Sequence, residues 1–142
     1  MFTGKICWRS KEMINYDKKV KTTQINLYSC EHPVLTDPQY GNLFLEELVE
    51  FISMNKIPEE IIGSKNPVTF QFNPGFVEKQ EHGVTGIITL YESHCAFHSW
   101  PELDGFLCVV ISSCKDYDVA ATARWIAEKV NAKGYKFKFL DF

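Results

Sequence analysis

The chain has 142 residues, the length of one ordinary domain, and 45% of them are apolar while 23% are charged. Its 15 basic and 18 acidic residues give a net charge of −3, so it lacks the basic excess of a nucleic-acid-binding protein. No apolar stretch is long enough to span a bilayer, and the N-terminal residues are too polar for a secretory signal. We therefore expect a single domain over residues 1–142, with neither nucleic acid nor membrane as a partner.

The cysteines indicate a reducing compartment. Their number is odd and no CxxC pair occurs, which argues against a disulfide framework and against a zinc ribbon. We therefore expect a cytoplasmic protein. Free cysteines are commonly buried, so we assign three of the five to packing, namely Cys7, Cys95 and Cys108.

The N-terminal half predicts one strand, one helix and a second strand, in that order. Residues 10–19 are polar and are expected to form a loop, whereas residues 20–29 have the β-branched and aromatic composition of a strand. A turn rich in proline and glycine follows at 33–41. Apolar residues at helical spacing then predict an amphipathic helix over 42–54, and strict alternation predicts a half-buried strand over 67–72.

The C-terminal half predicts four strands and a second helix. The strands are expected at 84–91, 94–99, 106–112 and 135–139. Asp118 can cap the second helix, which is expected to end near Gly134. Consecutive strands with short turns pair antiparallel, so the predicted fold class is α+β: an antiparallel sheet with two helices packed on one face, a two-layer sandwich. The second face of this sheet is free to meet another subunit.

Reactive side chains are densest between Tyr91 and Glu102. Alternate residues of a strand share a face, so His94 and His98 are expected on one face with Ser93 on the other. A third metal ligand at suitable spacing is missing, and we therefore predict no metal site here. Taken by themselves, the two histidines fit a functional site and a merely solvated or hydrogen-bonded sheet face equally well.

Three short motifs carry a resemblance to a known family. They are Gly-Val-Thr-Gly at 83–86, Glu-Ser-His at 92–94 and His-Ser-Trp-Pro-Glu at 98–102. Together they closely resemble the short prokaryotic form of the S-adenosylmethionine decarboxylase family, and the similarity extends over most of residues 22–140. The combination is specific, whereas an isolated Glu-Ser-His tripeptide would mean little.

The resemblance implies a zymogen that makes its own cofactor. Ser93 would attack the carbonyl of Glu92, the chain would separate into 1–92 and 93–142, and Ser93 would become a pyruvoyl group. By residue match, Thr85 and His98 would assist this processing. The catalytic residues that the resemblance implies are Ser93, His98, Cys114, Glu92 and Thr85.

The resemblance also implies the reaction and the assembly. The pyruvoyl group would form a Schiff base with a small amine substrate and accept electrons as carbon dioxide leaves, in the pathway to spermidine and other polyamines. Cys114 would return the proton to the carbanion, and the neighbouring Lys115 would favour its thiolate. Glu102 would bind the ribose hydroxyls of the substrate. The family forms a homodimer with active sites at the subunit interface.

Three departures from the family pattern keep alternatives open. Thr85 stands where the family usually has serine, and one additional residue separates Ser93 from Cys114. Lys79 stands where an aromatic residue stacks on the adenine, and Phe76 is three residues away. Arginine or ornithine is therefore an alternative substrate, with a carboxylate from Glu102, Asp104 or Asp116 to bind its cationic end. A non-processing regulatory homologue is a further alternative.

Overall fold

A computed structural model describes the backbone of residues 5–7, 13–15, 20–72 and 83–140. Six strands form one antiparallel sheet in the order β4-β5-β6-β7-β3-β8. Their bounds are β3 (Lys21–Tyr28), β4 (Val68–Phe72), β5 (Gly83–Leu90), β6 (Ser93–Trp100), β7 (Phe106–Ser113) and β8 (Gly134–Leu140). Two short strands, β1 (Lys5–Cys7) and β2 (Met13–Asn15), pair with each other. Residues 13–15 are therefore a strand inside a segment predicted to be a loop.

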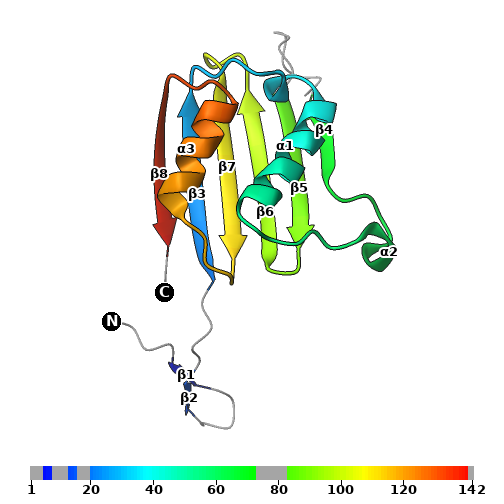
Figure 1. Ribbon diagram of the computed structural model, residues 1–142, viewed down its shortest axis with the longest axis vertical. Helices are drawn as coiled ribbons and strands as arrows, with labels where there is room; N and C mark the ends of the chain where they lie inside the picture. Colours follow the sequence, from blue (N-terminus) through cyan, green and yellow to red (C-terminus); the bar gives the residue numbers. More distant parts are fainter. Residues whose placement is uncertain (1–4, 8–12, 16–19, 73–82, 141–142) are drawn as a thin grey trace.

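Two helices, α1 (Pro38–Phe51) and α3 (Val119–Lys129), lie on the same face of the sheet (Figure 1). The predicted two-layer α+β arrangement is thus confirmed. Two short turns of helix, η1 (Pro33–Leu35) and α2 (Glu59–Ile62), flank α1 in the sequence. Among the described helices, none is long and apolar enough to cross a membrane.

The ends of both helices follow from their caps. The predicted start of α1 at residue 42 was wrong: the helix begins at Pro38, because the Asp37 carboxylate accepts a hydrogen bond from the amide of Gln39 at 2.9 Å. Proline fits the first helical position, where its missing N–H has no partner to lose. Asp118 caps α3 as predicted, but that helix ends at Lys129, earlier than expected.

The core lies between the sheet and the two helices. Alternate residues of β5, β6 and β7 point toward the helices and are buried, among them Ile88, Phe97 and Val109. Removing a side chain of this size from water contributes about 1.5–3 kcal/mol. At Gly86, an added Cβ would lie 2.6 Å from the ring of Phe97 and 3.2 Å from Leu45 of α1, so glycine makes room for both side chains between the sheet and the helix. Burial raises the pKa of the Cys95 thiol to about 12, consistent with the packing role predicted for it.

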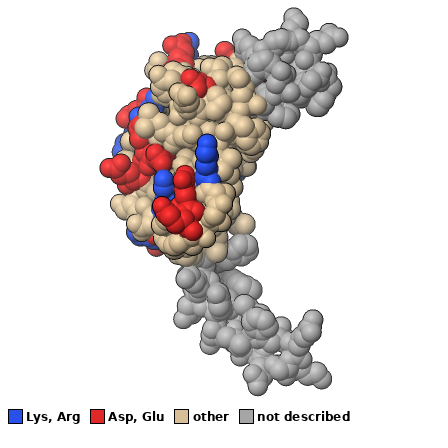
Figure 2. Space-filling model, turned by 90° about the vertical axis from the view of Figure 1, so that its right-hand side faces the viewer, with Lys and Arg blue, Asp and Glu red and all other residues tan. Residues whose placement is uncertain are grey.

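The opposite face of the sheet carries no helix in the described part of the chain, and we call it the open face. Its β4 and β5 edge exposes the apolar side chains of Val68, Phe70 and Ile87. Figure 2 views the molecule from this edge: charged side chains gather over the helix layer, and the opposite margin carries few. Exposed apolar surface of this kind is typical of an interaction site.

Candidate active site

The bond between Glu92 and Ser93 lies where the tight β5–β6 turn enters β6. Leu90 pairs with Ser93 across this turn, so Tyr91 and Glu92 make up the connection. The φ angle of Ser93 is +146°, in a region that side-chain-bearing residues rarely adopt. Such conformations cost about 1–3 kcal/mol and gather at functional sites. The serine of the motif therefore sits on a strained backbone.

The carbonyl oxygen of Glu92 is hydrogen-bonded from the neighbouring strand. The amide of Cys114, just beyond β7, donates to it at 3.0 Å. A donor at this oxygen polarises the carbonyl and would stabilise negative charge that develops on it under attack. The arrangement fits the first step expected at this bond.

Asn55 holds the side chain of Glu92, and nothing in the sequence pattern indicated it. The backbone amide and the side-chain amide of Asn55 donate to the two carboxylate oxygens of Glu92 at 3.1 and 3.0 Å. The amide of Tyr91 donates in turn to the Asn55 carbonyl at 3.1 Å. Desolvation works to raise the pKa of Glu92, but these hydrogen bonds and the charge of Lys115 hold it below its ordinary value.

Ser113 lies directly opposite Ser93. The two are cross-strand partners, Ser113 is buried, and Cys114 follows as an exposed residue. The Ser113 hydroxyl accepts from the amide of Lys115 at 2.9 Å and donates to its carbonyl at 3.1 Å. The register and burial therefore place Ser113, one residue before Cys114, inside the sheet beside the bond between Glu92 and Ser93.

Thr85 and His98 form a second polar site on the open face. They are cross-strand partners, and the Thr85 hydroxyl lies 3.1 Å from Nδ1 of His98. His98 is five residues beyond Ser93 along β6, which separates them by about 17 Å within one chain. The structure thus brings Thr85 and His98 together but does not bring them to Ser93.

The remaining candidate residues lie apart from Ser93. Glu102 is exposed in the turn that follows β6, at the other end of that strand. Asp104 accepts a hydrogen bond from Ser29 at 2.8 Å, and Asp116 forms an ion pair with Lys21 at 3.1 Å. Lys79 and Phe76, which the resemblance relates to adenine binding, lie outside the described residues.

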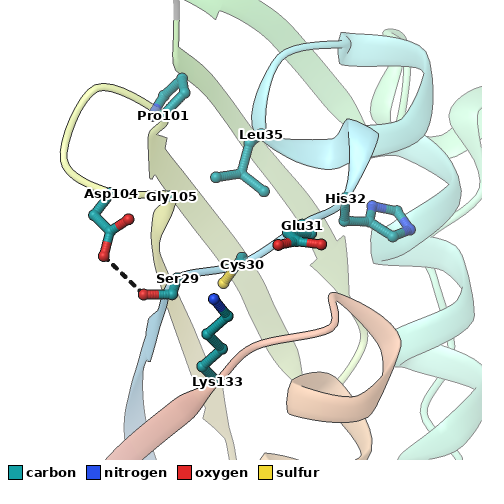
Figure 3. Close-up of a pocket in the computed structure, with 9 residues that line it drawn as sticks. All are labelled: Ser29, Cys30, Glu31, His32, Leu35, Pro101, Asp104, Gly105 and Lys133. Atoms are coloured by element: carbon teal, nitrogen blue, oxygen red, sulfur yellow. Dashed lines mark hydrogen bonds between the residues drawn. The ribbon is translucent and has the colours of Figure 1, made fainter.

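A pocket of about 290 Å³ opens at the end of the sheet opposite Ser93 (Figure 3). It lies between the end of β3, the turn at 101–105 and the loop before β8. Lys133 and Asp104 bring opposite charges to its lining. Ser93 is not among the lining residues, so this pocket is separate from the bond between Glu92 and Ser93.

The fold does not bring a third metal ligand to His94 and His98 in the part of the chain that is described. His94 pairs across the sheet with Thr89 and Ser112 rather than with another ligand. Within the described ranges, no three histidine, cysteine or acidic side chains gather as a metal site would need.

Comparison with known proteins points to one family. The family model described as S-adenosylmethionine decarboxylase matches residues 21–141. An S-adenosylmethionine decarboxylase proenzyme of Archaeoglobus fulgidus is 31% identical over 81% of this chain and 89% of its own. One of Pelotomaculum thermopropionicum is 32% identical over 73% and 71%. The crystal structure of the adenosylmethionine decarboxylase from Aquifex aeolicus has a TM-score of 0.66 over 88% of this chain and 91% of its own; at 23% identity, this likeness concerns the fold.

Proposed function

Because the chain belongs to the S-adenosylmethionine decarboxylase family, we propose that it is a pyruvoyl-dependent carboxy-lyase that decarboxylates S-adenosylmethionine. The relatives reported above carry the name of that activity, and neither is named for arginine or ornithine. One observation in the fold supports the proposal most: the strained Ser93 follows a carbonyl that already accepts a hydrogen bond from the Cys114 amide. The product would feed polyamine synthesis.

Self-cleavage is proposed at the bond between Glu92 and Ser93. The Ser93 hydroxyl attacks the Glu92 carbonyl carbon, the C–N bond breaks, and an ester and a free amine remain. Loss of the Ser93 α-proton then breaks the bond between Cβ and the ester oxygen, releases the main-chain carboxylate of Glu92 as the new C-terminus and leaves a dehydroalanine. Its imine form takes up water and releases ammonia, which leaves the pyruvoyl group at the start of the 93–142 fragment. The positive φ of Ser93 and the donor on its acyl carbonyl fit this origin of the group.

When formed, the pyruvoyl group supplies an electron sink for the bond to the departing carboxylate. Residues of this chain bind the substrate and move its protons. Cys114 is proposed to return a proton to the substrate carbon, since it is exposed and adjoins Glu92. Glu102 is proposed to bind the ribose hydroxyls.

We propose a homodimer in which the open faces of two chains meet. Within one chain, His98 lies about 17 Å from Ser93, too far for a proton transfer between them. A second copy related by a two-fold axis would bring its own Thr85 and His98 toward the first chain's Ser93. Burial of Val68, Phe70 and Ile87 would supply the apolar contact that such an interface needs. Glu102 would likewise act on the partner's site.

The cytoplasm is the compartment that we propose. Four cysteines lie in the part of the chain whose side chains are described, and each is a free thiol. Burial raises the pKa of Cys30 to about 11 and also raises that of Cys108, so these two thiols are poor nucleophiles. Free thiols of this kind persist in a reducing environment.

Replacing Cys114 with alanine is expected to leave self-cleavage intact while it slows turnover. Alanine retains the backbone amide that binds the Glu92 carbonyl but removes the thiol. Loss of general acid catalysis typically slows turnover about 10²- to 10⁴-fold. The variant's cleavage and its release of carbon dioxide from S-adenosylmethionine measure the two effects separately. Unchanged turnover would assign the proton donor to another residue.

The intact mass of the purified protein under denaturing conditions tests the proposed function. Two fragments that join at residues 92 and 93, the second with the mass of a pyruvoyl terminus, are the expected result. A single full-length mass that persists through long incubation would contradict the proposal and favour a non-processing homologue. Carbon dioxide release from S-adenosylmethionine, arginine and ornithine then tests the substrate.

A further inference from the structure

We propose that Asn55 is a positioning residue for the first step of self-cleavage, through its hydrogen bonds to the side chain of Glu92. The inference rests on the proposed function, because it concerns the same bond. Asn55 does not contact the atoms that react. It binds the side chain of the residue whose carbonyl is attacked, and so acts through Glu92.

Asn55 forms hydrogen bonds to Glu92, the residue on the acyl side of the bond, and to Tyr91 before it. Its backbone amide and its side-chain amide bind one carboxylate oxygen each, and its carbonyl binds the amide of Tyr91. Three hydrogen bonds from one residue thus fix two consecutive residues of the turn. The Cys114 amide holds the Glu92 carbonyl from the other strand. Glu92 is therefore held both at its side chain and at the carbonyl that Ser93 would attack.

The segment that presents Asn55 is itself anchored to the sheet. Lys56 forms an antiparallel bridge with Leu90, and the amide of Ile57 donates to the Thr89 carbonyl at 3.1 Å. The side chain of Asn66 donates to the carbonyls of Ile57 and Thr89, at 2.9 Å each. The backbone that directly follows Asn55 is therefore fixed to β5, which carries the turn with Glu92 at its end.

The same segment also contacts the loop that binds the Glu92 carbonyl. The Lys115 ammonium donates to the Ser53 carbonyl at 2.5 Å, and Lys115 is the residue that follows Cys114. The loop after α1 therefore binds both the Glu92 side chain and the loop that contains Cys114. Attack by Ser93 needs the hydroxyl and the carbonyl carbon in a near-attack geometry, which these contacts maintain.

Asn55→Asp is the sharpest test, because it keeps the size of the side chain while it replaces the amide donor with a carboxylate. The new carboxylate would face that of Glu92, so we expect self-cleavage at least about tenfold slower than in the wild type. The double variant Asn55→Asp with Glu92→Gln is expected to cleave faster than Asn55→Asp alone. In it, the glutamine oxygen can still accept from the backbone amide of residue 55, and its amide can donate to the new carboxylate.

Hydroxylamine cleaves esters, so it distinguishes a variant that forms the ester slowly from one that forms the ester but eliminates slowly. If Asn55 serves the attack by Ser93, the ester forms slowly and hydroxylamine will not accelerate cleavage of Asn55→Asp. Asn66→Ala is the control for a general loosening of this segment, since Asn66 anchors the segment without touching Glu92, and a smaller slowing is expected for it than for Asn55→Asp. Thermal unfolding of each variant identifies a temperature at which all are folded, where the rates are compared by intact mass.

Four outcomes would overturn the inference. They are cleavage of Asn55→Asp at the wild-type rate, acceleration by hydroxylamine, no recovery in the double variant, and equal slowing in folded Asn66→Ala. Each leaves the proposed function standing if the wild type cleaves. A wild-type chain that never cleaves would instead overturn the proposed function, and this inference with it.

Discussion

Replacing Ser93 with alanine is expected to leave a folded, full-length chain with no decarboxylase activity. Alanine has no hydroxyl to attack the Glu92 carbonyl, so neither the ester nor the pyruvoyl group can form. Ser93 is only half-buried and lies at the start of β6, so loss of its hydroxyl leaves the packing of the core intact. Intact mass and carbon dioxide release from S-adenosylmethionine measure the two expected losses.

A complete loss of decarboxylation in Ser93→Ala distinguishes the pyruvoyl mechanism from mechanisms that do not use Ser93 as the source of a cofactor. A decarboxylase that depends on a general acid or on binding alone would retain part of its rate without Ser93. Ser64→Ala serves as a control, because it also removes a serine hydroxyl, but from an exposed position in the loop after α2, away from the bond between residues 92 and 93. Any amine decarboxylation by the Ser93→Ala variant, above that of a mock purification, would refute the pyruvoyl hypothesis.

Coexpression of Ser93→Ala with His98→Ala is expected to restore processing that neither variant supports alone. In the mixed dimer that we propose, the Ser93 of the His98→Ala chain would face the intact His98 of its partner. Random pairing of equal amounts places about half of the His98→Ala chains in mixed dimers, so about half of them should cleave. Intact mass distinguishes the two full-length chains and identifies which of them is cut.

The direction of this complementation tests the dimer that we propose. Only the chain with Ser93 present and His98 replaced should be cleaved. Absence of cleavage in chains that form mixed dimers, confirmed by a tag on each variant, would show that His98 does not act across the interface. Efficient cleavage of the His98→Ala chain when expressed alone would show that His98 is not needed for processing at all.

Much of the fold follows from local patterns in the sequence. The packing role predicted for Cys95 is confirmed by its burial, and the alternation along β6 places His94 and His98 on the face opposite the buried Cys95 and Phe97. The start of α1 was missed because Pro38 was taken as part of a turn, although a proline after an Asp cap is also typical of a first helical position. Local propensity does not distinguish the two cases.

The candidate site was predicted less completely, because its contacts join distant segments. The motifs identified Ser93 and Glu92, but Asn55 reaches Glu92 from 37 residues away and has no motif of its own. Nothing in the spacing indicated that Ser113, rather than Cys114, pairs with Ser93. That register depends on the pairing of β6 with β7 along its whole length, which a sequence pattern does not determine.

The strand order has a consequence for the two fragments that cleavage would produce. Residues 1–92 contribute β3, β4 and β5 to the main sheet, and residues 93–142 contribute β6, β7 and β8. In the order β4-β5-β6-β7-β3-β8, a strand of one fragment neighbours a strand of the other at three ladders. The two fragments would therefore share one sheet, and they could separate only if the domain unfolded. Once separated, they would have to meet by diffusion, so recovery after denaturation would depend on concentration, whereas the uncut precursor carries every strand in one chain.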